Sequence, residues 1–350
     1  MLIARYLGEK RPQYIGQVIG GSIVVFALIS AVLFVVLVGF ARPISVLMQA
    51  PEEALGLTSG YVRICGAGIF FIVAYNLLAA IFRGLGDSQS PLLFVLVACI
   101  VNVFGDLFLV AGLHLDAASA AIATLAAQAA SVVCAVIMLL KKHLPFKLCK
   151  ADFRLNPQCR KFLSIGLPLA LQEFLTQLSF LALCAFVNRL GLEASSGYGV
   201  ACKIVNFAML IPSALMQSMA AFVSQNIGAG SKKRARQSMF TGIGIGLAFG
   251  CAVFANAFAY LKGFAPETIA TAVLFSMVGY FNGNNKTVWV MVQGLVQTLL
   301  VRLPMAYFMS IQPNASLTMI GLAAPTSTAV GIVLNICFYF YFERTSRSDS

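Results

Sequence analysis

The sequence predicts an all-α protein, a polytopic bundle of about ten transmembrane helices in two repeat-related lobes. Of its 350 residues, 60% are hydrophobic and only 10% are charged, and the mean hydropathy is +0.89. A soluble globular domain is roughly 25% charged, so this chain has too few charges to cover a soluble surface. The hydrophobic residues also occur in long runs, and about 20 apolar residues cross a bilayer as a helix.

The apolar runs define the individual spans. We expect membrane-spanning helices at residues 13–40, 58–82, 90–112, 118–140, 162–187, 196–222, 237–260, 267–282, 287–310 and 318–341. The eighth of these is shorter than a span requires.

The basic residues indicate how the protein is oriented. The net charge is +12, and most Lys and Arg side chains fall on one side of the predicted helices, whereas the acidic residues divide evenly. This asymmetry is the positive-inside pattern of membrane proteins and not a nucleic-acid-binding patch. We therefore expect a multi-pass protein of the cell (plasma or inner) membrane, with both termini and the loop 141–161 in the cytoplasm.

Short motifs recur in the same order in the two halves of the chain. A Gly-containing basic turn at 7–11 returns at 227–234, and the loop at 83–88 returns at 282–287. Repeated bundles with a substrate path between them are typical of transporters. The repeat predicts an N-terminal lobe of four helices (1–140), a cytoplasmic basic linker (141–161) and a C-terminal lobe of six helices, one of them short (162–350).

These motifs make the chain resemble the multidrug and toxic-compound extrusion (MATE) family over essentially its whole length. The resemblance rests on Arg83-Gly84-Leu85-Gly86-Asp87-Ser88, Asn102 with Asp106, Gly166-Leu167-Pro168, Gln225-Asn226-Ile227-Gly228-Ala229, Gly279-Tyr280-Phe281-Asn282-Gly283 and Val301-Arg302-Leu303-Pro304. It implies a twelve-helix antiporter that exports organic, often cationic, drugs or metabolites in exchange for H⁺ or Na⁺.

The polar residues of one predicted hairpin are the first candidates for a site. Counting from the outer ends of spans 90–112 and 118–140 pairs Asp106 with Thr124 and Asn102 with Gln128, about one helical turn apart. A carboxylate with amide and hydroxyl oxygens can bind Na⁺, or can exchange a proton when it is desolvated. The alternative is a satisfied polar patch that holds the hairpin together. The resemblance implies a cation or proton site at Asp106, Asn102 and Thr124, and gives no such support to Gln128.

Of the charged residues within predicted spans of the second lobe, Glu173 and Lys203 are further candidates for a site. Glu173 is near the middle of its helix, where an unpaired carboxylate is costly, and Lys203 is closer to an outer end. With Gln128 they are candidates for a substrate site or a second coupling site. The alternatives are a neutral, hydrogen-bonded carboxyl at Glu173 and a snorkelling or ion-paired ammonium at Lys203.

We therefore expect a monomeric transporter of small organic, cationic substrates that works in the lipid bilayer by alternating access. No nucleophile with a base beside it and no set of ligands with metal spacing is visible, so we expect neither an enzyme nor a metal site, and no cofactor besides the coupling ion. One rival is a related flippase for lipid-linked saccharides, which intramembrane Lys203 and Arg302 would suit.

The other rival is a truncated, transport-incompetent fragment. The repeat predicts that two helices are missing before the first motif, and that about 21 residues are missing around 262–267.

Overall fold

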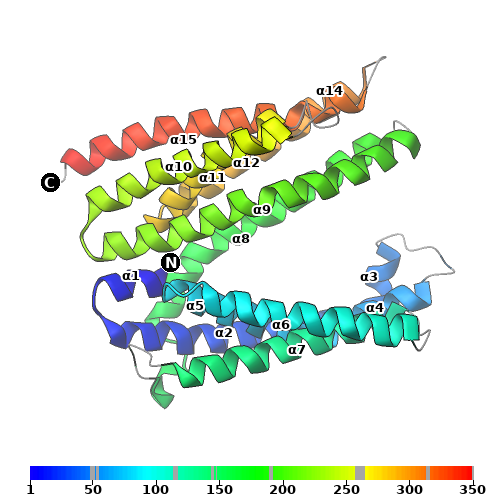
Figure 1. The fold of residues 1–350 in the computed structure, drawn as a ribbon, viewed down its shortest axis with the longest axis horizontal. Helices are drawn as coiled ribbons and strands as arrows, with labels where there is room; N and C mark the ends of the chain where they lie inside the picture. Colours follow the sequence, from blue (N-terminus) through cyan, green and yellow to red (C-terminus); the bar gives the residue numbers. More distant parts are fainter. Residues whose placement is uncertain are drawn as a thin grey trace. The chain divides into compact units, whose positions relative to one another are not determined.

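The computed structural model is helical throughout the part of the chain that it describes, which is residues 1–47, 52, 55–112, 117–142, 146, 148–188, 192–256, 265–312 and 316–348. Figure 1 follows the elements in chain order. They are α1 (Leu2–Gly8), α2 (Pro12–Gly39), α3 (Ala41–Leu47), α4 (Leu55–Ala67), α5 (Ile69–Gly84), α6 (Gln89–Asp106), η2 (Leu107–Gly112), α7 (Ala117–Lys141), η3 (Lys150–Asp152), α8 (Pro157–Asn188), α9 (Leu192–Gly228), α10 (Lys232–Asn256), α11 (Ala265–Gly283), α12 (Thr287–Leu295), η4 (Val296–Arg302), α13 (Leu303–Ser310), α14 (Leu317–Gly321) and α15 (Ala323–Ser348).

The predicted all-α membrane fold is confirmed. Seven of the described helices are long and apolar enough to cross a membrane, and the count is eight if the bent pair α4 and α5 forms one span. The bend is 48° and lies at Gly68. Helices also form at the two remaining expected spans, as α10 and α11, but they are not among the seven: α10 begins with four basic residues among its first five, and α11 carries Glu267 in its first turn. Of the range 262–267, at which missing residues were expected, residues 262–264 lie outside the described part of the chain, and α11 begins at Ala265.

The chain divides into two compact units, which are treated separately below. The N-terminal unit comprises Leu2–Arg160, and the C-terminal unit comprises Lys161–Ser350 together with Met1. The predicted three-part division at 140 and 161 stays a prediction.

In the N-terminal unit, α6 and α7 pack against each other as an antiparallel hairpin (Figure 1). Asp87 stabilises the end of this hairpin at which α6 begins and α7 ends. One of its carboxylate oxygens accepts hydrogen bonds from the backbone N–H groups of Gln89 and Ser90, at 3.0 and 3.1 Å, at the start of α6. The other oxygen accepts from the Ser90 hydroxyl and pairs with the ammonium of Lys142, just beyond the end of α7. Both ends of the hairpin are therefore tied to one side chain.

In the C-terminal unit, α9, α10 and α11 pack closely through glycines. A Cβ at Gly283 would lie 2.5 Å from Cβ of Val223, and one at Gly279 would lie 2.7 Å from the carbonyl oxygen of Met216. Atoms this close clash, so only glycine lets α11 approach α9 at these points. The surrounding core includes Met239 and Phe281.

The only tryptophan of the sequence lies where α12 meets α15. The indole of Trp289 stacks on Phe338, with ring centroids 4.2 Å apart, and its Nε1 donates a hydrogen bond to Oδ1 of Asn335 at 3.1 Å. An indole that is both stacked and hydrogen-bonded has its apolar ring and its polar N–H satisfied together. This contact joins the two helices near one end of the unit.

Two π-helical segments interrupt the α-helical geometry. η2 continues α6 directly after Asp106, and η4 joins α12 to α13 and ends at Arg302. π-Segments are rare and occur frequently at functional sites. Here each one directly follows or contains a charged residue of a membrane-spanning helix.

Candidate functional site

The α6–α7 hairpin brings together residues of the predicted cation site. The side-chain amide of Asn102 donates a hydrogen bond to the hydroxyl oxygen of Thr124 at 3.3 Å. The predicted layers instead paired Asn102 with Gln128 and Asp106 with Thr124. That counting assumed a regular α-helix up to the outer end of the span, whereas the π-helical η2 changes the number of residues per turn there.

Two acceptor oxygens lie close to this hydrogen bond in the fold. Oδ1 of Asp106, one helical turn beyond Asn102, and Oε1 of Gln128, one turn beyond Thr124, are both buried, and within the described part of the chain neither has a hydrogen-bond partner. Buried polar atoms are nearly always satisfied, and an orphaned one requires an explanation. A carboxyl and an amide oxygen are acceptors that a proton or a hard cation such as Na⁺ would satisfy.

Tyr61 of α4 is a neighbour of this site that the sequence did not indicate. α4 packs against α7, and the Tyr61 side chain is close enough to Cys65 and Asp106 to interact electrostatically with both. Tyr61 is 41% exposed in the unit. No spacing in the sequence relates it to Asp106, because the two residues come from different helices.

The candidates of the second lobe lie on separate helices of the C-terminal unit. Glu173 is on an exposed face of α8, where its carboxylate accepts a hydrogen bond from Nε2 of Gln177, one turn later, at 2.9 Å. Lys203 is exposed on α9. The third candidate for a substrate or second coupling site, Gln128, belongs to the N-terminal unit.

A buried charged pair of the C-terminal unit was not recognised as a pair. Glu267, in the first turn of α11, is 5% exposed and lies within electrostatic range of Arg302, which is 7% exposed. Nε of Arg302 also donates a hydrogen bond to the hydroxyl oxygen of Ser327 at 3.3 Å, and its guanidinium lies 5.0 Å from the ring centroid of Phe180. Buried charges are usually paired, so Arg302 within a span was a signal that a carboxylate lies nearby.

Comparison with known proteins gives consistent relatives. A family model described as MatE matches residues 1–108 and 168–262. The probable multidrug resistance protein YoeA of Bacillus subtilis (strain 168) is 26% identical over 251 residues, which are 69% of this chain and 54% of that protein. The FAD transporter of Shewanella oneidensis is 26% identical over 215 residues, which are 60% of this chain and 48% of that protein.

A solved structure described as MATE in the bent conformation matches the fold. Its TM-score is 0.88 at 18% identity, and the match covers 99% of this chain and 83% of that one. At this identity the likeness concerns the fold alone. By contrast, the chain spans only about half the length of the curated relatives that it matches.

Proposed function

This chain belongs to the MatE family of transporters, and from this premise we propose that it exports small organic compounds across the cell membrane, driven by H⁺ or Na⁺ moving the other way. The proposal includes a cationic drug or metabolite as the substrate, a monomer as the working unit and both termini in the cytoplasm. It is supported by relatives named for multidrug resistance and by the asymmetry of the basic residues.

The observation that carries the coupling part of the proposal is the orphaned carboxylate oxygen of Asp106 in the N-terminal unit. Oδ1 of Asp106 and Oε1 of Gln128 are buried without hydrogen-bond partners among the described residues, beside the hydrogen bond between Asn102 and Thr124. Leaving such an atom unsatisfied in a low-dielectric environment costs roughly 1–3 kcal/mol. A proton on Asp106, or a Na⁺ held by Asp106 together with oxygens of Asn102 and Thr124, would remove that cost at Asp106.

Coupling then follows from differential binding. The ion stabilises the conformation in which these oxygens can surround it, and the substrate stabilises another conformation. A ligand shifts such an equilibrium only by its difference in affinity for the two states. In this mechanism Asp106 takes up and releases the ion, while Asn102 and Thr124 hold the geometry around it.

The saccharide-flippase alternative draws on cationic side chains within the spans. One of the two cationic residues on which this alternative depends, Arg302, is buried near Glu267 and hydrogen-bonded to Ser327. These contacts favour a structural role for Arg302. Lys203 is exposed, and its ammonium could contact an anionic substrate. Transport of an anionic, lipid-linked saccharide is therefore the second candidate function.

A transport assay on the 350-residue chain tests the proposal. The chain is reconstituted into liposomes, and uptake of a fluorescent organic cation is measured under an imposed proton or Na⁺ gradient. Asp106→Asn should lower the gradient-driven rate at least about tenfold, which corresponds to roughly 1.4 kcal/mol in the barrier. Thr124→Ala should lower it less, because it removes one ligand and no charge.

Asp152→Asn is the matched control, since it removes a carboxylate of the same unit from outside the spans, and it should transport like the parent chain. Parent-like transport by the Asp106→Asn chain would overturn the coupling site. A parent chain that inserts and folds but shows no gradient-driven transport would favour the transport-incompetent alternative.

A further inference from the structure

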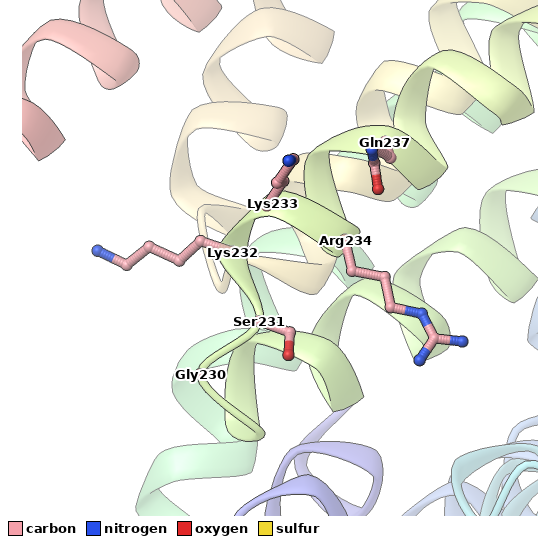
Figure 2. Close-up of a pocket in the computed structure, with 6 residues that line it drawn as sticks. All are labelled: Gly230, Ser231, Lys232, Lys233, Arg234 and Gln237. Carbon is pink, nitrogen blue, oxygen red and sulfur yellow. The ribbon is translucent and has the colours of Figure 1, made fainter.

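The turn between α9 and α10 is hollowed and strongly basic. Residues Gly230, Ser231, Lys232, Lys233, Arg234 and Gln237 line an open cavity of about 580 Å³. Gly230 has a positive φ of 75°, a conformation that glycine adopts without strain, so the chain turns sharply before the three consecutive cationic side chains. Figure 2 shows that these side chains spread from the turn in different directions.

The charges of this turn are not neutralised within the described part of the chain. No carboxylate there comes within 4.0 Å of Lys232, Lys233 or Arg234, and all three are exposed. The nearby carboxylate of Glu343, at the end of α15, is already paired with Arg236 at 3.6 Å. Three adjacent like charges repel one another, so this arrangement favours an anionic partner.

Comparable basic residues of the N-terminal unit do have acidic partners. Arg5 lies 3.1 Å from Glu9, and Lys142 pairs with Asp87. Membrane proteins in general carry excess Lys and Arg on one side, and within that excess the α9–α10 turn brings three cationic side chains into consecutive positions.

Aromatic side chains accompany the charges at this end of the C-terminal unit. The guanidinium of Arg234 lies 5.6 Å from the ring centroid of Phe222, and the ammonium of Lys286 lies 4.8 Å from that of Phe342. Nearby on α10, the ring of Phe240 is 52% exposed. Aromatic rings together with Lys and Arg are typical of the level of lipid headgroups.

We infer that the α9–α10 turn is a binding surface for the headgroups of anionic phospholipids. Phosphate is the shared chemistry of lipid headgroups and free inorganic phosphate, and the geometry favours the lipid. In Figure 2, Lys232 and Arg234 extend to opposite sides of the turn, so they cannot converge on one small anion but can contact a layer of headgroups. The neighbouring exposed rings supply the apolar contact that acyl chains need and that free phosphate does not.

Native mass spectrometry of the 350-residue chain in detergent tests this inference. Phosphatidylglycerol and phosphatidylcholine with the same acyl chains are added at equal concentration, and the bound fraction of each is measured. The parent chain should retain more phosphatidylglycerol. A Lys or Arg near an anionic surface changes affinity by roughly fivefold, so the variant Lys232→Gln/Lys233→Gln/Arg234→Gln should lose about tenfold or more of this preference and leave phosphatidylcholine binding unchanged.

The control variant removes the same number of charges elsewhere. Lys150→Gln/Arg154→Gln/Arg160→Gln lies in the N-terminal unit and should keep the preference. An equal loss in both variants would show unspecific attraction to net charge and would overturn the inference. Displacement of phosphatidylglycerol by millimolar inorganic phosphate, at constant ionic strength, would overturn it in favour of a site for free phosphate.

Discussion

The Asp87 carboxylate should measurably stabilise the hairpin that carries the proposed coupling site. Burial raises the pKa of Asp87, but hydrogen bonds from Lys142 and Ser90 outweigh it and lower the pKa to about 2. An unfolded aspartate has a pKa of about 3.9, so a lowering of this size corresponds to roughly 2.5 kcal/mol. Solvent screening of the exposed Lys142 ammonium reduces the expected contribution to about 1–2 kcal/mol. For a chain of 350 residues, Asp87→Asn should therefore lower the melting temperature by about 1–3 °C.

The pH dependence of this loss has a definite sign. A carboxylate whose pKa is lower in the folded state adds stability above its unfolded pKa, and this stability is lost as the pH falls through the folded pKa. The difference in stability between the parent and Asp87→Asn should thus be constant from about pH 5 to pH 8 and shrink between roughly pH 4 and pH 2. Melting curves of the purified protein, recorded in detergent by fluorescence-detected size exclusion, measure it.

A double-mutant cycle separates the ion pair from the backbone hydrogen bonds. Lys142→Gln removes the ion pair, and with it the ammonium that lies 5.8 Å from the ring centroid of Phe82, and should cost about 0.2–1 kcal/mol. In the Asp87→Asn background the same change should cost nothing further. Additive losses, or an Asp87→Asn protein that melts like the parent at neutral pH, would refute the assigned role of Asp87.

Two further predictions concern packing and buried charge in the C-terminal unit, both read from the same melting curves. Gly283→Ala should destabilise the protein by about 1–3 kcal/mol, because there is no room for a Cβ at this position. Gly244 lies on an exposed face of α10 with open space around it, so Gly244→Ala should stabilise the protein by about 0.5–1 kcal/mol. Equal effects of the two substitutions would contradict the packing argument. Arg302→Met should cost roughly 1–3 kcal/mol, because it removes the cation near the buried Glu267 carboxyl and the hydrogen bond to Ser327. Adding Glu267→Gln should recover part of that loss, and two fully additive losses would show that the two side chains do not interact.

The sequence predicted the helical class and most spans because hydrophobic run length is a local property. It placed Asn102 and Thr124 on facing helices because their depths could be counted from a short loop. The sequence did not predict that Asn102 pairs with Thr124, because depths were counted along regular α-helices and the π-helical η2 changes the number of residues per turn. The sequence could not predict that Tyr61 lies near Asp106, because this proximity depends on how α4 packs against α7.

The buried pair in the C-terminal unit illustrates a different limit. The sequence shows Arg302 as an intramembrane charge but does not indicate which carboxyl lies near it. Glu267 lies 35 residues earlier, at the start of a span judged short. The proximity of Glu267 and Arg302 depends on how the helices of this unit pack in space, and a single sequence does not record that packing.

The stacked indole where α12 meets α15 gives this protein an intrinsic fluorescent probe. All tryptophan emission from the chain comes from Trp289, whose ring lies against Phe338 and whose N–H is bonded to Asn335. Indole emission moves to longer wavelength when the ring meets water, so any rearrangement that separates these two helices would change the spectrum without an added dye. Titrating a substrate or a coupling ion while recording that spectrum would observe the C-terminal unit alone.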